Sequence, residues 1–279
     1  MENPLKISII DKTGTKDFEK LCVLLKKFSL ETYLGNKPEF ANVKGQERYK
    51  VLNKAINELD GKENNSILSN EDIENIKKEF EHQVTIAKKF TNSSREDLQT
   101  RYYVLKDGDN IVAFQQGQIW KEPERTEGWR NLIYAEPEYR GKAGETLDIQ
   151  GNLNENSYFD ALYEEIEKWF DENEVKYERI CTGVNMVHNI QKYINKGFTP
   201  FSKNQSNIFL EKYSEKSQEI LEENKNGKSG YEDTINDDKS RTLLLKESTN
   251  MIKEELKQEL ELKHKGNTYK TSEDNGEGR

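Results

Sequence analysis

The spacing of apolar residues predicts how the first third of the chain folds. Residues 5–10 (LKISII) form a short, mostly apolar run, which predicts a strand. From Thr15 the apolar positions recur every three or four residues, which predicts a helix that Thr15 caps. Two further helices are predicted over 46–59 and 69–90, and the second opens with the capping-box sequence Ser-Asn-Glu-Asp. We therefore expect one strand followed by three helices.

From Arg101 the pattern changes to that of strands. Three strands are predicted, the first two joined by a tight Asp-Gly-Asp-Asn turn. A helix, a strand, a short helix and a last strand follow. The first three strands are predicted over 101–106, 111–120 and 129–135. The helix is predicted over 158–170, the next strand over 178–184, the short helix over 186–196 and the last strand over 206–213. This order predicts an α/β (α+β) fold, with helices packed on a mixed sheet.

The composition changes in the last quarter of the chain of 279 residues, since no Phe or Trp follows Phe209. Residues 214–241 are rich in Asn, Gly, Lys and Asp, which is typical of a charged linker. Residues 242–264 predict a helix for association with itself or with a partner, and 265–279 are predicted to be disordered. One folded domain over 1–213 and a partly disordered tail are therefore expected.

Charge and cysteine content narrow the classes of function. The chain has 43 basic and 52 acidic residues, a net charge of −9, and no dense run of Lys or Arg, which argues against nucleic-acid binding. Neither a membrane span nor a secretory leader is predicted, so a cytoplasmic location is expected. Cys22 and Cys181 lie in apolar contexts typical of reduced core residues, and the three histidines have no zinc-site spacing, so no metal is expected.

The segment 132–144 (LIYAEPEYRGKAG) carries the chemistry. A predicted strand stops before a proline, and an Arg-Gly-Lys-Ala-Gly turn follows. Small residues let backbone N–H groups converge on an anion, and the positive end of a following helix would strengthen binding. Arg140 and Lys142 would add side-chain charge. The segment therefore predicts a pyrophosphate cradle, with an ordinary surface turn as the alternative.

At these residues the chain resembles the GNAT superfamily of acyl-CoA-dependent N-acyltransferases. Pro-Glu-Tyr-Arg-Gly-Lys at 137–142 is similar to the family's loop for the CoA pyrophosphate. The short helix that ends in Tyr193, Gly197 and Phe198 resembles the family's Tyr-x-x-x-Gly-Phe ending. The resemblance covers about 5–213 and implies a GNAT-like mixed, mostly antiparallel sheet flanked by helices, here with an enlarged N-terminal helical region.

The resemblance also implies acetyl-CoA as acyl donor and assigns positions to it. The backbone before the loop would hold the acyl carbonyl, and the loop would hold the pyrophosphate. These cofactor-binding positions are Ile133, Tyr134, Ala135, Arg140, Gly141, Lys142, Ala143 and Gly144. Tyr193 matches the general acid that protonates the departing thiolate. Glu127, or a water relayed through Tyr134, is the candidate general base.

The loop departs from the family's pattern in three ways. Ala143 replaces a glycine, Glu145 brings a carboxylate toward the diphosphate, and about a dozen residues separate the loop from the long helix. Two arrangements stay open. Either a helix begins near Gly144, breaks and restarts near Ser157, or the cradle is remodelled.

The leading functional hypothesis is transfer of an acetyl group from acetyl-CoA to an amine by direct attack. The acceptor would be a small-molecule amine or a protein lysine or N-terminus, and the acidic balance favours cationic acceptors such as polyamines or aminoglycosides. Two alternatives stay open. The altered loop suggests a catalytically weak or inactive GNAT-fold binding or regulatory module, and the tail helix suggests an interaction function with the domain as scaffold.

Overall fold

The computed structural model describes residues 4–35, 37, 40, 43, 45–64, 66–123, 125–183, 186–205, 207–214, 217, 219, 222, 239–254 and 257. The chain divides into two compact units, Met1–Val175 and Lys176–Arg279. Each unit contains strands and helices of its own.

The first unit is built on strands in the order β6-β5-β1-β2-β3-β4. All neighbouring pairs are antiparallel except β1 and β5. The strands are β1 (Leu5–Ile10), β2 (Leu98–Asp107), β3 (Asn110–Lys121), β4 (Thr126–Ala135), β5 (Thr146–Leu147) and β6 (Leu153–Asn154). The β2–β3 hairpin turns through Gly108, whose φ of 55° is a left-handed value that glycine adopts more easily than other residues.

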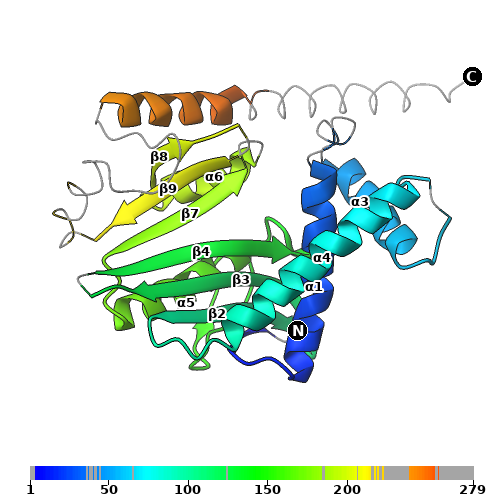
Figure 1. The fold of residues 1–279 in the computed structure, drawn as a ribbon, viewed down its shortest axis with the longest axis horizontal. Coiled ribbons are helices and arrows are strands. Elements are labelled where there is room, and N and C mark those ends of the chain that lie inside the picture. Colours follow the sequence, from blue (N-terminus) through cyan, green and yellow to red (C-terminus); the bar gives the residue numbers. More distant parts are fainter. Residues whose placement is uncertain are drawn as a thin grey trace, which may run out of the picture. The chain divides into compact units, whose positions relative to one another are not determined.

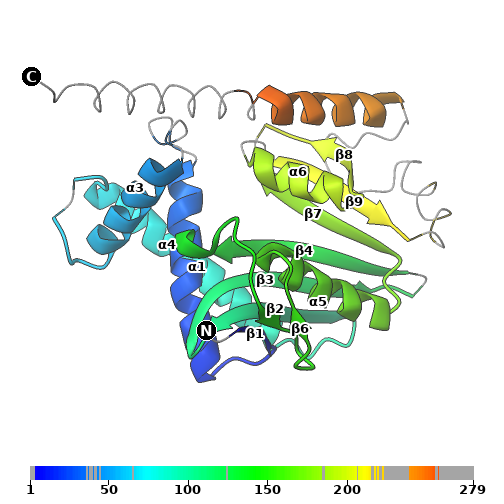
Figure 2. The same ribbon diagram turned by 180° about the vertical axis from the view of Figure 1, so that it is seen from behind.

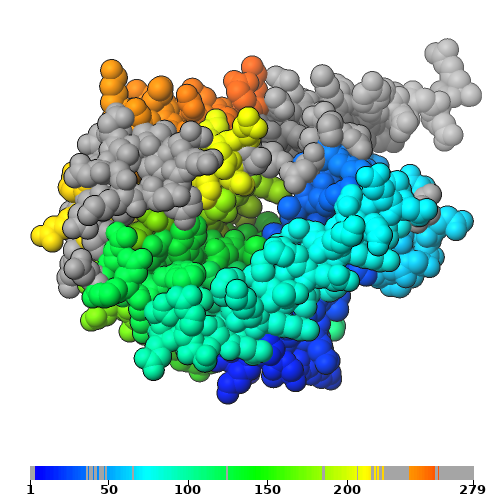
Figure 3. Space-filling model, in the orientation of Figure 1, coloured from blue at the N-terminus to red at the C-terminus, as the bar shows by residue number. Residues whose placement is uncertain are grey.

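Helices cover both faces of this sheet. The helices of this unit are α1 (Lys16–Gly35), α3 (Gly45–Leu59), α4 (Asn70–Thr91) and α5 (Tyr158–Glu172). Helices α1 and α4 lie on one face and α5 on the other, as the two opposite views show (Figures 1 and 2). In the space-filling view α4, in cyan, forms part of the molecular surface on its face (Figure 3).

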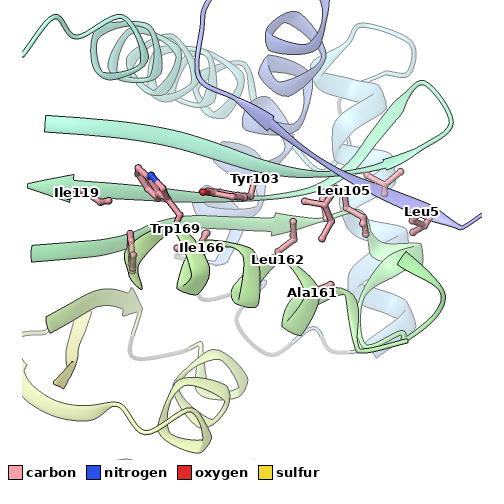
Figure 4. Close-up of a cluster of buried hydrophobic side chains, with 12 residues drawn as sticks. Leu5, Tyr103, Leu105, Ile119, Ala161, Leu162, Ile166 and Trp169 are labelled. Atoms are coloured by element: carbon pink, nitrogen blue, oxygen red, sulfur yellow. The ribbon is translucent and has the colours of Figure 1, made fainter. Parts of the chain in front are cut away.

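Two apolar cores result from the alternation of side chains along β2. Tyr102 packs on the side of α1 and α4, and its neighbour Tyr103 packs on the side of α5. Figure 4 shows the α5 core, in which Leu162, Ile166 and Trp169 pack against the strands. Both faces of β2 and β3 are therefore buried, and the sheet is a fixed platform for the loops at its ends.

Local side-chain bonds begin the helices as the sequence predicts. Thr15 Oγ1 accepts a hydrogen bond from the backbone N–H of Phe18 at 3.1 Å, ahead of α1. Ser69 Oγ accepts from the N–H of Asp72 at 3.1 Å, and Asp72 Oδ2 accepts from the N–H of Ser69 at 2.9 Å. The predicted cap and capping box are therefore confirmed.

The predicted N-terminal helical region has a core of its own, away from the sheet. It gathers Leu30, Leu34, Leu52, Ala55, Leu59, Leu68 and Ile76 from α1, α3, α4 and the connection before α4. Glu58, with 2% of its surface exposed, closes this core. Its carboxylate accepts hydrogen bonds from Ser66 Oγ at 2.7 Å and from the N–H groups of Ser66, Ile67 and Leu68 at 2.8–3.1 Å.

The second unit contains a three-stranded antiparallel group in the order β7-β9-β8. Its elements are β7 (Tyr177–Gly183), α6 (Val187–Asn195), β8 (Thr199–Lys203) and β9 (Asn207–Tyr213). Residues 239–254 are helical, and Arg241 at the start of this helix forms an ion pair with Glu211 of β9. Leu244 and Ile252 of the same helix are buried.

The predicted fold class, a mostly antiparallel mixed sheet with helices, is confirmed. The structure adds β8, which the sequence pattern does not predict because Pro200 interrupts it; a proline is tolerated there since β8 is an edge strand. It also adds β5 and β6.

Most of the expected linker, part of the expected 242–264 helix and all of 265–279 lie outside the described residues, and the domain limits stay predictions. No described helix has the length and apolar character needed to cross a membrane.

Candidate functional site

A β-bulge in β4 is the first element of the site. Gln115 pairs with Ile133, whereas Gly117 pairs with Arg130, so three steps along β4 match two along β3. One extra residue of β4, at Asn131 or Leu132, is therefore left out of the ladder. A bulge bends its strand and frees backbone groups, so the second half of β4 is set apart from its first half.

Uncharged side chains lie beside this bulge on the α1/α4 side of the sheet. Asn131 Nδ2 donates a hydrogen bond to Gln118 Oε1 at 2.6 Å, and Gln118 Nε2 donates to Thr100 Oγ1 at 3.2 Å. Gln116 Nε2 donates to the Tyr102 hydroxyl at 2.8 Å. These bonds satisfy amides that would otherwise be costly to bury.

The predicted loop follows β4 directly. A single 3-10 turn, η1 (Pro137–Tyr139), leads to Arg140, and Gly141 has a φ of 66° with no atom within 4 Å of the place where a Cβ would lie. Gly141, Lys142 and Ala143 are exposed. The loop therefore presents small residues and one lysine to solvent.

The loop lies against the beginning of α5 although thirteen residues, 145–157, separate the two in sequence. The carbonyl of Lys142 accepts from the N–H of Tyr158 at 3.2 Å, and Ala143 and Ser157 form an antiparallel bridge. Ser157 caps α5 by accepting from the N–H of Asp160 at 3.1 Å. No helix begins at Gly144. The intervening residues include the short β5–β6 pair instead, so the remodelled arrangement is the one observed.

Gly144 lies against the Tyr158 side chain of α5. A Cβ on this residue would lie 2.7 Å from the Tyr158 hydroxyl oxygen and 3.4 Å from the ring carbon that bears it. We expect Gly144→Ala to lower the free energy of unfolding by about 1–2 kcal/mol, because the phenol must shift. In a Tyr158→Phe background the clash is removed, and the same change should be neutral or stabilising by about 0.5 kcal/mol. Chemical denaturation of the four variants measures this, and equal losses in both backgrounds would contradict the contact.

Arg140 is bound by protein groups on three sides. Its Nε donates to the carbonyl of Ala135 at 2.7 Å, and Nη1 and Nη2 donate to the two carboxylate oxygens of Glu31 at 2.7 and 2.5 Å. Its guanidinium carbon lies 5.1 Å from the centre of the Tyr134 ring. Burial lowers the pKa of the Arg140 guanidinium, but the bonds to Glu31 more than offset this, so the pKa is raised.

The structure places the other predicted cofactor-binding residues at the same end of β4. Ile133 and Ala135 are partly buried, and Ala135 packs on the α5 core. Tyr134 is buried on the opposite face, stacked on Phe114 with ring centres 6.2 Å apart. Burial raises the pKa of the Tyr134 phenol well above its ordinary value, so this residue stays protonated at neutral pH.

Of the two predicted catalytic residues, Glu127 shares the first unit with the loop and Tyr193 does not. Glu127 is buried near the start of β4, and the rise of a strand places it roughly 20 Å from Ile133. Tyr193 belongs to α6 in the second unit. It is 1% exposed, and its ring meets Phe198 edge-on at 5.5 Å. Both catalytic roles stay predictions.

Sequence reasoning misses Glu31 and Tyr158. Glu31 lies on α1, 109 residues before its partner Arg140, and no local pattern connects the two. Tyr158 directly follows Ser157, where the sequence suggests that a helix restarts. If the loop and this helix start are taken as neighbours, Tyr158 can be placed beside the loop.

No protein-family model and no curated protein sequence matches the chain. Solved structures of N-acetyltransferases do. PaiA N-acetyltransferase from Thermoplasma acidophilum in complex with coenzyme A is 16% identical, with a TM-score of 0.45 over 75% of this chain and 99% of that one. The NatC complex bound to Gag peptide and CoA is 12% identical, with a TM-score of 0.43 over 76% of this chain and 99% of that one. An acetyltransferase from Streptococcus agalactiae is 10% identical, with a TM-score of 0.40 over 75% of this chain and 98% of that one. The similarity of this chain to these acetyltransferases concerns the fold alone.

Proposed function

We propose that this protein is an acyl-CoA-dependent N-acyltransferase that transfers an acetyl group from acetyl-CoA to an amine. One observation carries the proposal: a bulged β4 leads directly into the 140–144 loop, and this loop lies against the beginning of α5. A strand with freed backbone groups, followed by a glycine-containing loop at the positive end of a helix, suits a thioester that carries a diphosphate.

The loop residues fit a diphosphate group. Gly141 leaves open space where a side chain would stand, and Lys142 is an exposed cation beside it. The Tyr158 hydroxyl, held close to Gly144, is a further donor at the same place. Bound acetyl-CoA would supply the reactive thioester.

The residues of this chain would then divide the work of the reaction. Backbone N–H groups at the bulge of β4 would donate to the acyl oxygen as it gains negative charge. The uncharged amides beside the bulge, Gln116 and Asn131, would orient an amine through hydrogen bonds. Tyr193 would give a proton to the departing thiolate, a role that rests on its motif.

Calorimetric titration with acetyl-CoA, compared with CoA alone, tests the proposal. We expect micromolar binding, followed by release of free thiol when the acceptor amine is added. A screen of polyamines, aminoglycosides and peptide amines then identifies the acceptor. Absence of binding at millimolar acetyl-CoA would refute the proposal.

A charge placed at Gly141 tests the loop assignment. Gly141→Asp and Gly141→Asn have nearly the same size, and both residues tolerate a positive φ, so they differ chiefly in charge. We expect the aspartate variant to bind acetyl-CoA about tenfold more weakly than the asparagine variant at low salt, with a smaller difference at high salt. Equal affinities of the two variants would show that the diphosphate lies elsewhere.

A second candidate function is a GNAT-fold binding or regulatory module without efficient transfer. The backbone pairing between 142–144 and 156–158 favours it, because the carbonyl of Lys142 and the N–H of Gly144 are directed to α5 and to the residues just before it. Binding of acetyl-CoA without thiol release in the presence of any amine in the screen would support this function.

A further inference from the structure

Helix α1 holds both ends of the turn between β4 and the loop. Lys27 forms an ion pair with Glu136, at the beginning of the turn, and Glu31 forms one with Arg140, at its end. Lys27 and Glu31 are four residues apart on α1, so their side chains lie on the same helix face. Figure 1 shows β4 ending beside α1.

The turn itself is closed by Arg140. Its Nε returns to the carbonyl of Ala135, the last residue of β4, and the N–H of Tyr139 donates to the carbonyl of Glu136 at 2.9 Å. The side chains of the Glu31–Arg140 pair are 12% and 24% exposed. A bidentate pair with so little solvent contact fixes the direction of the guanidinium, because its planar fork matches the carboxylate.

We propose that Glu31 and Arg140 are a positioning pair, which sets the geometry of the acyl-CoA loop from α1 without touching the diphosphate. The inference rests on the proposed function, and it adds Glu31, which lies far from the loop in the sequence, to the residues on which acetyl-CoA binding depends. Since Glu31 neutralises the guanidinium and Ala135 takes its Nε, the cation directed at the diphosphate is Lys142, which is exposed and forms no ion pair with a described residue.

The alternative, that Arg140 itself binds the diphosphate, predicts the opposite effect of neutralising Glu31. Under that alternative Glu31→Gln frees a positive charge for the ligand, so acetyl-CoA should bind as well as before or more tightly. A positioning role predicts weaker binding, because the turn loses the fixed orientation of Arg140 and a partly buried charge loses its partner.

Calorimetric titration of four proteins with acetyl-CoA distinguishes the two roles. We expect Glu31→Gln and Arg140→Lys each to weaken binding roughly tenfold, because a misplaced binding element is costly and a lysine cannot form the fork. The double variant should bind no more weakly than the single variants, as expected for two residues that act as one unit. Unchanged or tighter binding by Glu31→Gln would overturn the proposal.

Asp60→Asn is the matched control. It removes the ion pair between Asp60 and Lys26, the residue next to Lys27 on α1, and touches neither β4 nor the loop. Its affinity for acetyl-CoA should equal that of the wild type. At saturating acetyl-CoA the kcat of Glu31→Gln should stay within about twofold of the wild type, since the pair contacts no reacting atom.

Hydrogen exchange of the backbone amides of 136–144, measured without acetyl-CoA, separates this inference from the proposed function. Faster exchange in Glu31→Gln but not in Asp60→Asn is expected. If the wild type fails to bind acetyl-CoA, the proposed function fails, and the exchange rates still decide on the pair. Equal rates in the wild type and Glu31→Gln would overturn it.

Discussion

Replacing Tyr193 with phenylalanine is expected to slow acyl transfer about a hundredfold or more while acetyl-CoA affinity stays the same. The change removes only the hydroxyl. The ring is 1% exposed and packs edge-on against Phe198, so the phenylalanine should keep this ring contact and the fold should be preserved. Single-turnover release of thiol, measured at saturating acetyl-CoA, reports the chemical step.

Tyr177→Phe is the matched control for this experiment. Tyr177 is another buried tyrosine of the second unit, and its ring stacks on Tyr213 with centres 5.4 Å apart. Loss of this hydroxyl should leave transfer within about twofold, since it lies outside the motif. If Tyr193→Phe turned over as fast as the wild type, Tyr193 would not be the proton donor.

Removing the Glu58 carboxylate is expected to have the largest effect on stability. Glu58→Ala should lower the free energy of unfolding by about 2–4 kcal/mol, because the N–H groups of Ile67 and Leu68 lose their acceptor inside the helical core. Glu63→Ala is the control. Glu63 is exposed and accepts one bond, from Asn57, so its loss should cost no more than about 0.5 kcal/mol.

The Glu58 contribution should also depend on pH. Burial raises the pKa of this carboxyl, but the hydrogen bonds from Leu68, Ser66 and Ile67 outweigh burial, so the pKa is lowered in the folded protein. The stabilisation is therefore fully present above the unfolded pKa of about 4.3 and is lost as the pH falls through the folded pKa. The free energies of unfolding of the wild type and of Glu58→Ala, plotted against pH, should therefore converge in acid. A difference between them that stays constant to roughly two pH units below the unfolded pKa would contradict this.

Elements that depend on short-range interactions could be predicted from the sequence. The caps at Thr15 and Ser69 need only a hydroxyl within three residues of the helix start, and both are found as expected. The alternation of apolar residues likewise gave β2, β3 and β4 within a few residues of their observed limits. In these cases the sequence neighbours of a residue are also its contacts.

Elements that depend on pairing between distant segments were not predicted. Strand β8 contains Pro200, which argues against a strand until the structure shows it at an edge, paired with β9 alone. The pairing of β5 with β1 joins segments about 140 residues apart, and each partner contributes only two residues, too few for a sequence pattern. The bulge in β4 is likewise visible only in the register between two strands.

The sequence by itself determined the order of the helices and of the longer strands, the caps at Thr15 and Ser69 and the position of the 140–144 loop, because these follow from side-chain period and backbone freedom over a few residues. The tertiary structure alone decided what the loop residues do. It directed Arg140 to Glu31 rather than to solvent and brought the loop to the N-terminus of α5 across an inserted hairpin. Ion pairs and close packing form between groups that meet only after the chain has folded, so a single sequence carries no local trace of them.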